Sequence, residues 1–217
     1  MKNKTLGSEV SSNSIPFTVR VETEVKRIFH VNIHDSIEQL TDIEDAISAF
    51  QVASEQDEIR INLNCRGGAV SVGDTLMHAM HNCKAPIFVY GAGTIASYAT
   101  FILLEADSFE LSPFVDILCH SASFGTGGKQ IDVVRHANFV HQQSEKMLRH
   151  YYKYFFTEEE LLRIINDKYE HYMDAEEFME RYHRREELRA LEDESSEDVD
   201  TDTAEEEFEE GEEREYD

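Results

Sequence analysis

Three short segments of the sequence carry the residue types that acyl transfer requires. Ser97 lies among small residues in the segment 93–99, which follows an apolar run. His120 comes 23 positions later, at the end of another apolar run. A glycine pair, Gly67-Gly68, ends a third such run. A nucleophile, a base and a loop of backbone N–H donors are the minimum set for attack on a peptide carbonyl.

Each of these residues also has an ordinary structural interpretation. A serine at a helix N-terminus usually caps the helix, a glycine pair after a strand is usually a turn, and a histidine at a strand end is often only structural. The small neighbours of Ser97 favour the functional interpretation, because they let a substrate backbone approach closely. Gly68 and Tyr98 would then donate backbone N–H groups to an oxyanion, and His120 would be the base, since imidazole exchanges protons near neutral pH.

The elements that must position these residues alternate between strand-like and helix-like patterns. This alternation predicts βαβ units with a parallel sheet. Thr157 is a predicted helix N-cap, and Asp174 with Glu177 forms a predicted capping box. Predicted strands cover 17–21, 27–33, 58–64, 85–91, 108–111 and 116–120, and predicted helices cover 36–54, 72–82, 95–106 and 130–156, with further helices starting at 157 and 174.

Charge and cysteine content limit the possible function classes. The 217 residues carry a formal net charge of -25, of which -16 falls in residues 186–217. No basic surface for DNA or RNA is expected. The three scattered cysteines favour a reducing compartment, and no apolar run is long enough for a membrane span, so we expect a cytoplasmic protein without a membrane partner. The predicted organisation is a disordered N-terminus (1–16), one domain (17–185) and an acidic disordered tail (186–217).

The order of these motifs resembles the ClpP family, the proteolytic subunit of Clp proteases, from about Arg27 to Glu177. The family's Ser-Pro-Gly-Gly-like turn corresponds to residues 65–68, which read Cys-Arg-Gly-Gly. Its Gly-x-Ala-Ser-x-Ala/Gly motif corresponds to the segment 93–99, with one extra residue between the glycine and the alanine. The base is followed by a glycine-rich segment, an aspartate (here Asp132) and a long handle helix.

The resemblance also implies a third catalytic residue. In the family an aspartate lies shortly before a Phe-Met/Leu-Ser-Ala-x-Glu-Ala segment. Residues 172–177, Tyr-Met-Asp-Ala-Glu-Glu, match that segment, and counting back places Glu170 at the position of the aspartate. Carboxylates of either length orient the imidazole in known triads. Asp167, three residues earlier, is the fallback, and both residues also fit the interpretation of ordinary exposed acids.

The resemblance implies an α/β fold of the ClpP/crotonase type, built of stacked βαβ units with a protruding handle helix. It implies a serine endopeptidase with Ser97 as nucleophile, His120 as base, and Gly68 and Tyr98 as oxyanion donors. The site would need no metal or cofactor. The expected partners are other copies in a heptamer-type homo-oligomeric ring, a separate AAA+ unfoldase that uses ATP, and peptide or protein substrates.

Departures from the family pattern keep other functions open. Arg66 replaces the proline of the turn, and residues 178–185 read as a charged helix where the family has a strand segment. These departures suggest a divergent member of viral or plasmid origin. The alternatives are a catalytically inactive structural or regulatory subunit and a virus-associated processing protease. A crotonase-type acyl-CoA enzyme shares the fold but would not use a serine–histidine pair, which argues against it.

Overall fold

The computed structural model describes the backbone of residues 25–209 and the side chains of residues 25–194. The strand predicted at 17–21 and the N-terminal segment 1–16 lie outside the described residues. No helix between residues 25 and 209 is long and apolar enough to cross a bilayer.

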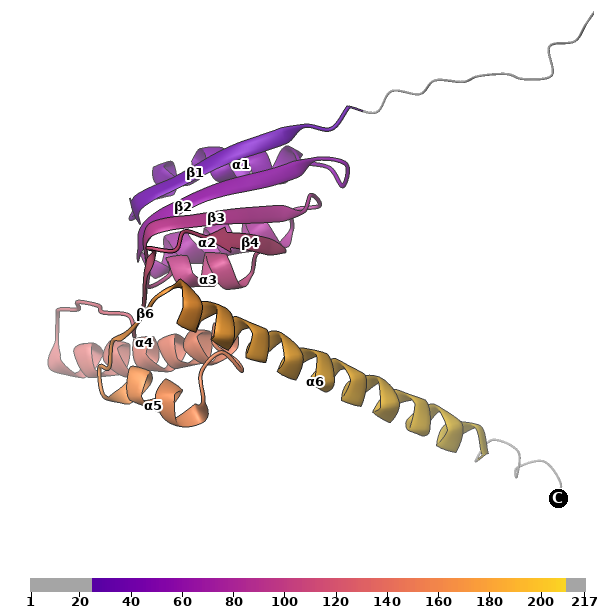
Figure 1. The fold of residues 1–217 in the computed structure, drawn as a ribbon. Coiled ribbons are helices and arrows are strands. Elements are labelled where there is room, and N and C mark those ends of the chain that lie inside the picture. Colours follow the sequence, from indigo (N-terminus) through magenta and orange to yellow (C-terminus); the bar gives the residue numbers. More distant parts are fainter. Residues whose placement is uncertain (1–24, 210–217) are drawn as a thin grey trace, which may run out of the picture.

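A six-stranded sheet occupies the upper part of the molecule in Figure 1, above the C-terminal helices. Its main path follows the order β1-β2-β3-β5-β6, and β4 pairs with β3 beside β5. All pairings are parallel except that of β6 with β5, which is antiparallel. The strands are β1 (Ile28–Ile37), β2 (Glu58–Gly68), β3 (Ile87–Ala96), β4 (Ser108–Leu111), β5 (Asp116–Cys119) and β6 (His171–Met173).

Apolar alternation in the sequence explains why these segments form strands. In β2, the side chains of Ile59, Ile61, Leu63 and Cys65 are buried while the intervening residues are mostly exposed. This period of two places one face of the strand against the helices. Three helices, α1 (Glu44–Val52), α2 (Val70–His81) and α3 (Ala99–Leu104), lie on the same side of the sheet in Figure 1, and a short 3-10 helix, η1 (Leu40–Asp42), precedes α1.

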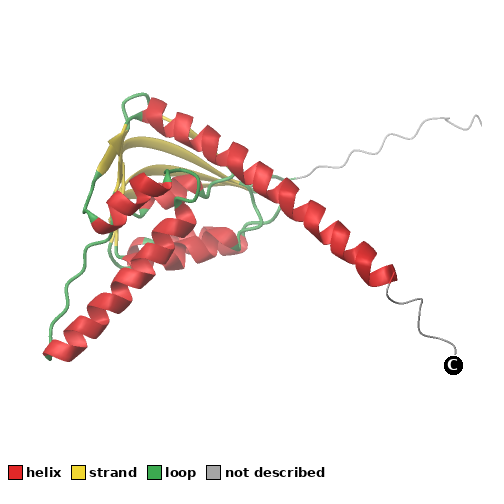
Figure 2. Cartoon of the chain, turned by 90° about the horizontal axis from the view of Figure 1, so that it is seen from below, coloured by secondary structure: helices red, strands yellow, loops and turns green. Residues whose placement is uncertain are grey.

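The C-terminal third consists mainly of helices: α4 (Gln130–Tyr151), α5 (Glu158–Asn166) and α6 (Ala175–Glu209). Two long helices project from the body in different directions, as Figure 2 shows. The only buried residues of α4 are Leu148 and Tyr151, close to its end. The first part of α4 therefore protrudes, as the predicted handle does, while its second half packs near α5. The predicted ClpP-type α/β fold is confirmed.

Several predicted boundaries were wrong. The helix predicted at 36–54 is shorter, because β1 continues to Ile37 and α1 begins only at Glu44. The helix predicted from Ile95 begins at Ala99, because Ile95 and Ala96 pair with β5 in the sheet. The long helix predicted to reach 156 ends at Tyr151. Short-range periodicity could not reveal these limits, because strand pairing with distant segments sets two of them.

The helix α6 continues to Glu209, through most of the segment for which the sequence predicts an acidic disordered tail. Two contacts support its exposed middle part. Glu186 pairs with Arg189 at 3.9 Å, and Glu192 pairs with Lys153 of the body at 2.6 Å. Glutamate, leucine, alanine and arginine also have high helix propensity, which favours helix despite the density of acidic residues.

Candidate active site

Ser97 lies at the sharp turn between β3 and α3. Its φ angle is 56°, a left-handed conformation that is uncommon for any residue with a Cβ atom. Hydrogen bonds hold it there: its N–H donates to the Leu118 carbonyl at 2.8 Å, and its own carbonyl accepts from the Thr100 N–H at 3.0 Å and hydroxyl at 2.7 Å. A strained serine at a strand-to-helix turn presents its hydroxyl away from the sheet, as nucleophilic serines do.

His120 directly follows β5, the strand beside β3. The two strands pair in parallel, with Ile95 opposite Ile117 and Ala96 opposite Leu118. Ser97 and His120 therefore leave the sheet at the carboxyl ends of neighbouring strands, where ligands of parallel sheets commonly bind. Both side chains are half-buried, so each is accessible to a substrate.

A cavity of about 490 Å³ brings these residues together. Ser97, His120, Gly67, Gly68 and Tyr98 all line it. Apolar side chains from three helices form part of the wall: Val70, Phe101, Met147 and Leu148. Further polar side chains also line it: Ser36, Glu38, Arg66 and Ser123. Apolar surface together with placed polar groups is the usual composition of a substrate site.

The glycine pair lies directly beside the turn that carries Ser97. Gly67 has a φ angle of 85°, and a Cβ atom at this position would lie 2.8 Å from the backbone nitrogen of Tyr98. Gly68 has a φ angle of 152° and packs against the backbone of Ile37. No side chain other than hydrogen fits at either position. The two backbone segments that carry the predicted oxyanion donors, Gly68 and Tyr98, therefore approach one another without an intervening side chain.

The side chain of Tyr98 anchors this segment to α2. It is 2 % exposed, and its hydroxyl donates to Asp74 at 2.6 Å. A Cβ atom at Gly73 would lie 2.5 Å from the Tyr98 ring, so α2 packs closely on that ring. Burial, followed by the hydrogen bond to Asp74, raises the pKa of Tyr98 well above its ordinary value. The phenol stays neutral and acts as a structural anchor, while the backbone N–H is the predicted functional group.

Glu170 and Asp167, the two candidates for the third catalytic residue, lie at different places between α5 and β6. Glu170 is exposed and immediately precedes β6, which pairs with β5 through Cys119 opposite His171. One further step in that antiparallel register places Glu170 opposite His120. Asp167 is the exposed C-cap of α5. The register thus favours Glu170 over Asp167 as the third residue.

The three polar groups are not connected by hydrogen bonds in this structure. Among the described residues, no hydrogen bond joins Ser97 to His120, or His120 to Glu170. Glu170 instead accepts one from the Tyr172 hydroxyl at 3.0 Å. In enzymes without substrate, catalytic hydrogen bonds are often long and tighten only in the complex. The catalytic roles of Ser97, His120 and Glu170 stay predictions.

Two neighbouring groups were not recognised from the sequence. Cys65 is fully buried, and its sulfur accepts a hydrogen bond from the Gly67 N–H at 3.3 Å; burial raises the pKa of its thiol, so it stays protonated. Tyr172 was regarded only as part of a motif. Its position two residues after Glu170 could have indicated a shared strand face, but the strand itself was missed.

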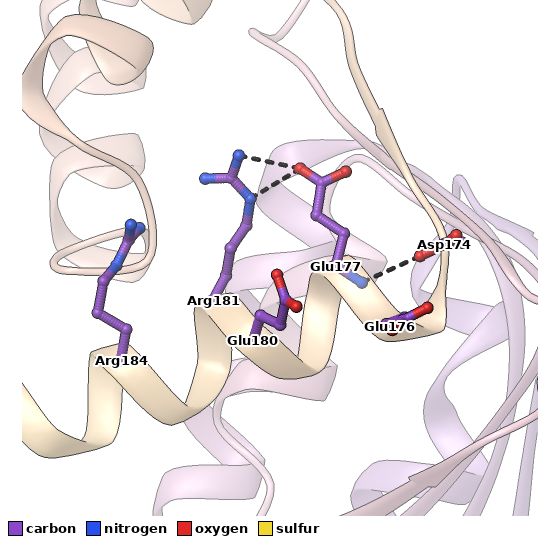
Figure 3. Close-up of a pocket in the computed structure, with 6 residues that line it drawn as sticks. All are labelled: Asp174, Glu176, Glu177, Glu180, Arg181 and Arg184. Atoms are coloured by element: carbon purple, nitrogen blue, oxygen red, sulfur yellow. Dashed lines mark hydrogen bonds and ion pairs between the residues drawn. The ribbon is translucent and has the colours of Figure 1, made fainter.

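A second cavity, of about 510 Å³, lies at the start of α6 and has a different character. Asp174, Glu176, Glu177, Glu180, Arg181 and Arg184 line it (Figure 3). Glu177 pairs with Arg181 at 2.9 Å, and the Asp174 carboxylate accepts from the Glu177 N–H at 3.0 Å. The latter bond confirms Asp174 as the cap of this helix. The Glu177 side chain is engaged with Arg181 and His171, so these contacts stabilise the start of α6.

Comparison with known proteins identifies the family of this chain. The family described as Clp protease matches residues 19–181, which is most of the chain. The ATP-dependent Clp protease proteolytic subunit 3 of Rhizobium meliloti (strain 1021) is 28 % identical over 99 residues, covering 45 % of this chain. The match covers 51 % of that relative, so the chain spans about half the length of the curated relative it matches. On the extent of the family match, together with its fold, this chain belongs to the Clp protease family.

Proposed function

We propose that this protein is a serine endopeptidase that hydrolyses peptide bonds with Ser97 as nucleophile and His120 as general base. The observation that carries the proposal is the shared cavity. Ser97 at its strained turn, His120 at the end of the next strand and the Gly67-Gly68 pair all line the same space. These are the parts that acyl transfer requires, and they come from three separate strands.

The proposed reaction has two halves. The Ser97 hydroxyl attacks the peptide carbonyl while His120 takes its proton, and the negative charge on the carbonyl oxygen is stabilised by the N–H groups of Gly68 and Tyr98. His120 then returns the proton to the leaving amine, so that an acyl-enzyme forms. Water, deprotonated by His120, hydrolyses this ester. Glu170 orients the imidazole, and Asp167 is the fallback for that role.

Hydrolysis of fluorogenic peptides by the full-length chain tests this proposal. The wild type is expected to cleave internal peptide bonds, and Ser97→Ala and His120→Ala are expected to lower kcat by several orders of magnitude, since triad members act as a unit. Cleavage that persists in Ser97→Ala would contradict the proposal.

We further propose that the chain works as a homo-oligomer enclosing the sites. The protruding part of α4 supports this. Ile131, Val134 and Phe139 are 64 %, 50 % and 58 % exposed there. Such side chains gain by burial against another copy, at about 25 cal/mol per Å². In sedimentation, the double variant Ile131→Lys/Phe139→Lys should form smaller species than the wild type, whereas Gln142→Lys, on an exposed polar position of α4, should not.

An AAA+ unfoldase is the proposed partner for folded substrates, because an enclosed site admits only unfolded chains. The name of the matched relative contains the words "ATP-dependent". Degradation of a folded reporter should then require a Clp-type ATPase and ATP, whereas short peptides should be cleaved without either. Cleavage of the folded reporter by the chain alone would contradict this part of the proposal.

One observation favours a second candidate, a catalytically inactive subunit of such an assembly. Within the described residues Ser97 and His120 are not hydrogen-bonded to one another, so the hydroxyl is not activated in this state. A fluorophosphonate separates the two candidates, because it reacts only with an activated serine. Failure of the assembled wild type to react would favour the inactive subunit.

A further inference from the structure

Tyr172 and Glu170 are linked on the solvent-facing side of β6. The Tyr172 hydroxyl donates to the Glu170 carboxylate at 3.0 Å. The two residues are two positions apart, so their side chains leave the same face of the strand. Tyr172 is 65 % exposed, so its ring adds little to the core. Among the described residues, the bond to Glu170 is the hydrogen bond that the Tyr172 side chain makes.

The pairing of β6 with β5 relates Tyr172 and Glu170 to His120. Tyr172 lies opposite Leu118, and Cys119 lies opposite His171. Leu118 lies on the half-exposed face of β5, and Ile117 and Cys119 lie on its buried face; His120, directly after the strand, is half-buried as Leu118 is. Directly opposed residues of antiparallel strands have Cβ atoms about 4.5–5.5 Å apart. Continued one step beyond the paired residues, this register would align Tyr172, Glu170 and His120 along one face of the β5–β6 pair.

The other face of β6 fixes the strand itself. Met173 and His171 are 5 % and 8 % exposed, and the His171 ring bonds to Glu177 at 2.8 Å. The backbone beside Glu170 is thus held in place. What stays variable is the glutamate side chain, which has one more rotatable bond than an aspartate would have. A carboxylate can accept at both oxygens, so one oxygen bound to Tyr172 leaves the other available.

We propose that Tyr172 is a positioning residue, which holds Glu170 on the strand face that leads to His120, so that its free carboxylate oxygen accepts a hydrogen bond from His120 when a bound substrate tightens the site. This inference rests on the proposed peptidase function. The resemblance described above places an aspartate and a phenylalanine at these two positions. Glutamate and tyrosine form a matched pair: the longer carboxylate requires a tether, and the phenol supplies it.

A double-mutant cycle tests this pairing, using fluorophosphonate labelling of Ser97 and the kcat and KM of peptide hydrolysis. The proteins are wild type, Tyr172→Phe, Glu170→Asp and the double variant. Tyr90→Phe is the control, since Tyr90 is also exposed (40 %) but lies on β3, and its hydroxyl makes no hydrogen bond among the described residues. Thermal melting should be unchanged in Tyr172→Phe, because the ring is mostly exposed.

The expected result is non-additive. Tyr172→Phe should lower kcat and the labelling rate about tenfold with unchanged KM, which corresponds to one charge-assisted hydrogen bond. Glu170→Asp should also be slow, because the phenol holds the shorter carboxylate away from His120. The double variant should recover to within about threefold of wild type, a coupling typical of residues in contact. Tyr90→Phe should match wild type.

Two outcomes overturn the inference in distinguishable ways. If the wild type is labelled and Tyr172→Phe reacts at the same rate, or if the double variant shows only the product of the two single effects, the tether is wrong while the peptidase proposal stands. If the wild type carries no label at Ser97, both fail.

Discussion

Gly67 and Ser97 lie so close together that a Cβ atom at position 67 would be 2.7 Å from the Cβ atom of Ser97. This contact joins the end of β2 to the turn after β3. The strands pair irregularly at this point, with a register shift between Leu63 and Cys65. The shift and the positive φ of Gly67 turn the glycine pair toward the serine, which makes the contact a requirement of the site's geometry.

Replacing Gly67 by alanine should therefore abolish most of the activity. The new methyl group would collide with Ser97, and a φ of 85° is strained for alanine. We expect labelling of Ser97 to slow about 100-fold or more, the size of effect seen when an oxyanion donor is lost. Gly125→Ala is the control, because no atom lies within 4 Å of a Cβ atom there. Equal labelling rates for the two variants would contradict the assigned geometry.

Cys65 should support the same turn through its sulfur. In Cys65→Ala the buried Gly67 N–H loses its acceptor, which costs about 1–3 kcal/mol. Cys65→Ser keeps an acceptor and should lose less. Urea unfolding of both variants, with Cys83→Ala as a half-buried comparison, measures the difference. Equal stability of Cys65→Ala and wild type would show that the sulfur does not hold the turn.

Arg185 should anchor α6 to the end of α3. Its side chain is 4 % exposed, bonding to Glu105 at 2.8 Å and to the Leu104 carbonyl at 3.0 Å. Glu105→Gln removes the more buried of the two carboxylates that pair with this cation, so we expect a loss of about 3 kcal/mol. Glu186 also pairs with Arg185 but is 44 % exposed, so Glu186→Gln should cost less than about 1 kcal/mol. Chemical unfolding measures both losses of stability. A loss for Glu105→Gln no larger than that for Glu186→Gln would contradict the role of Arg185 as an anchor.

Acid should weaken the junction between α5 and α6. The hydrogen bonds from Arg181 lower the pKa of Glu160 from 4.5 to about 2. A carboxyl group with a lowered pKa in the folded state stabilises the fold above its unfolded pKa and loses that contribution as the pH falls toward the folded one. Stability from this group should thus disappear between about pH 4.5 and 2.

Unfolding at several pH values tests this window. Glu160→Gln should be less stable than wild type at pH 7, and the difference should shrink as the pH falls below 4.5. Glu159→Gln, at an exposed neighbouring position of α5, should follow the wild-type curve. A difference between Glu160→Gln and wild type that is constant with pH would contradict the assignment.

Local patterns were sufficient where local interactions determine the structure. The strand β4 has the predicted bounds, 108–111. Thr157 caps α5 as predicted, with reciprocal hydrogen bonds to Glu160. Ser97, His120 and Gly68 were singled out by residue type and order, and the structure brings them to one cavity.

Local sequence patterns did not predict the elements whose structure depends on pairing with distant segments. The strand β6 has only three residues, and its partner β5 lies more than 50 positions earlier in the chain. No periodicity can be read from so short a segment, so the pairing of β6 with β5 was not available from the sequence. The hydrogen bond from Gly67 to Cys65 likewise depends on how the turn folds back, which residue types alone do not specify.

The most direct test of the account is intact-mass analysis of the assembled full-length chain after incubation with a fluorophosphonate. We predict one adduct per chain in the wild type and none in Ser97→Ala or His120→Ala. Ser123→Ala, which alters another serine that lines the same cavity, should keep the adduct. An unlabelled wild type, or an adduct that remains in Ser97→Ala, would contradict the assignment of Ser97 as an activated nucleophile.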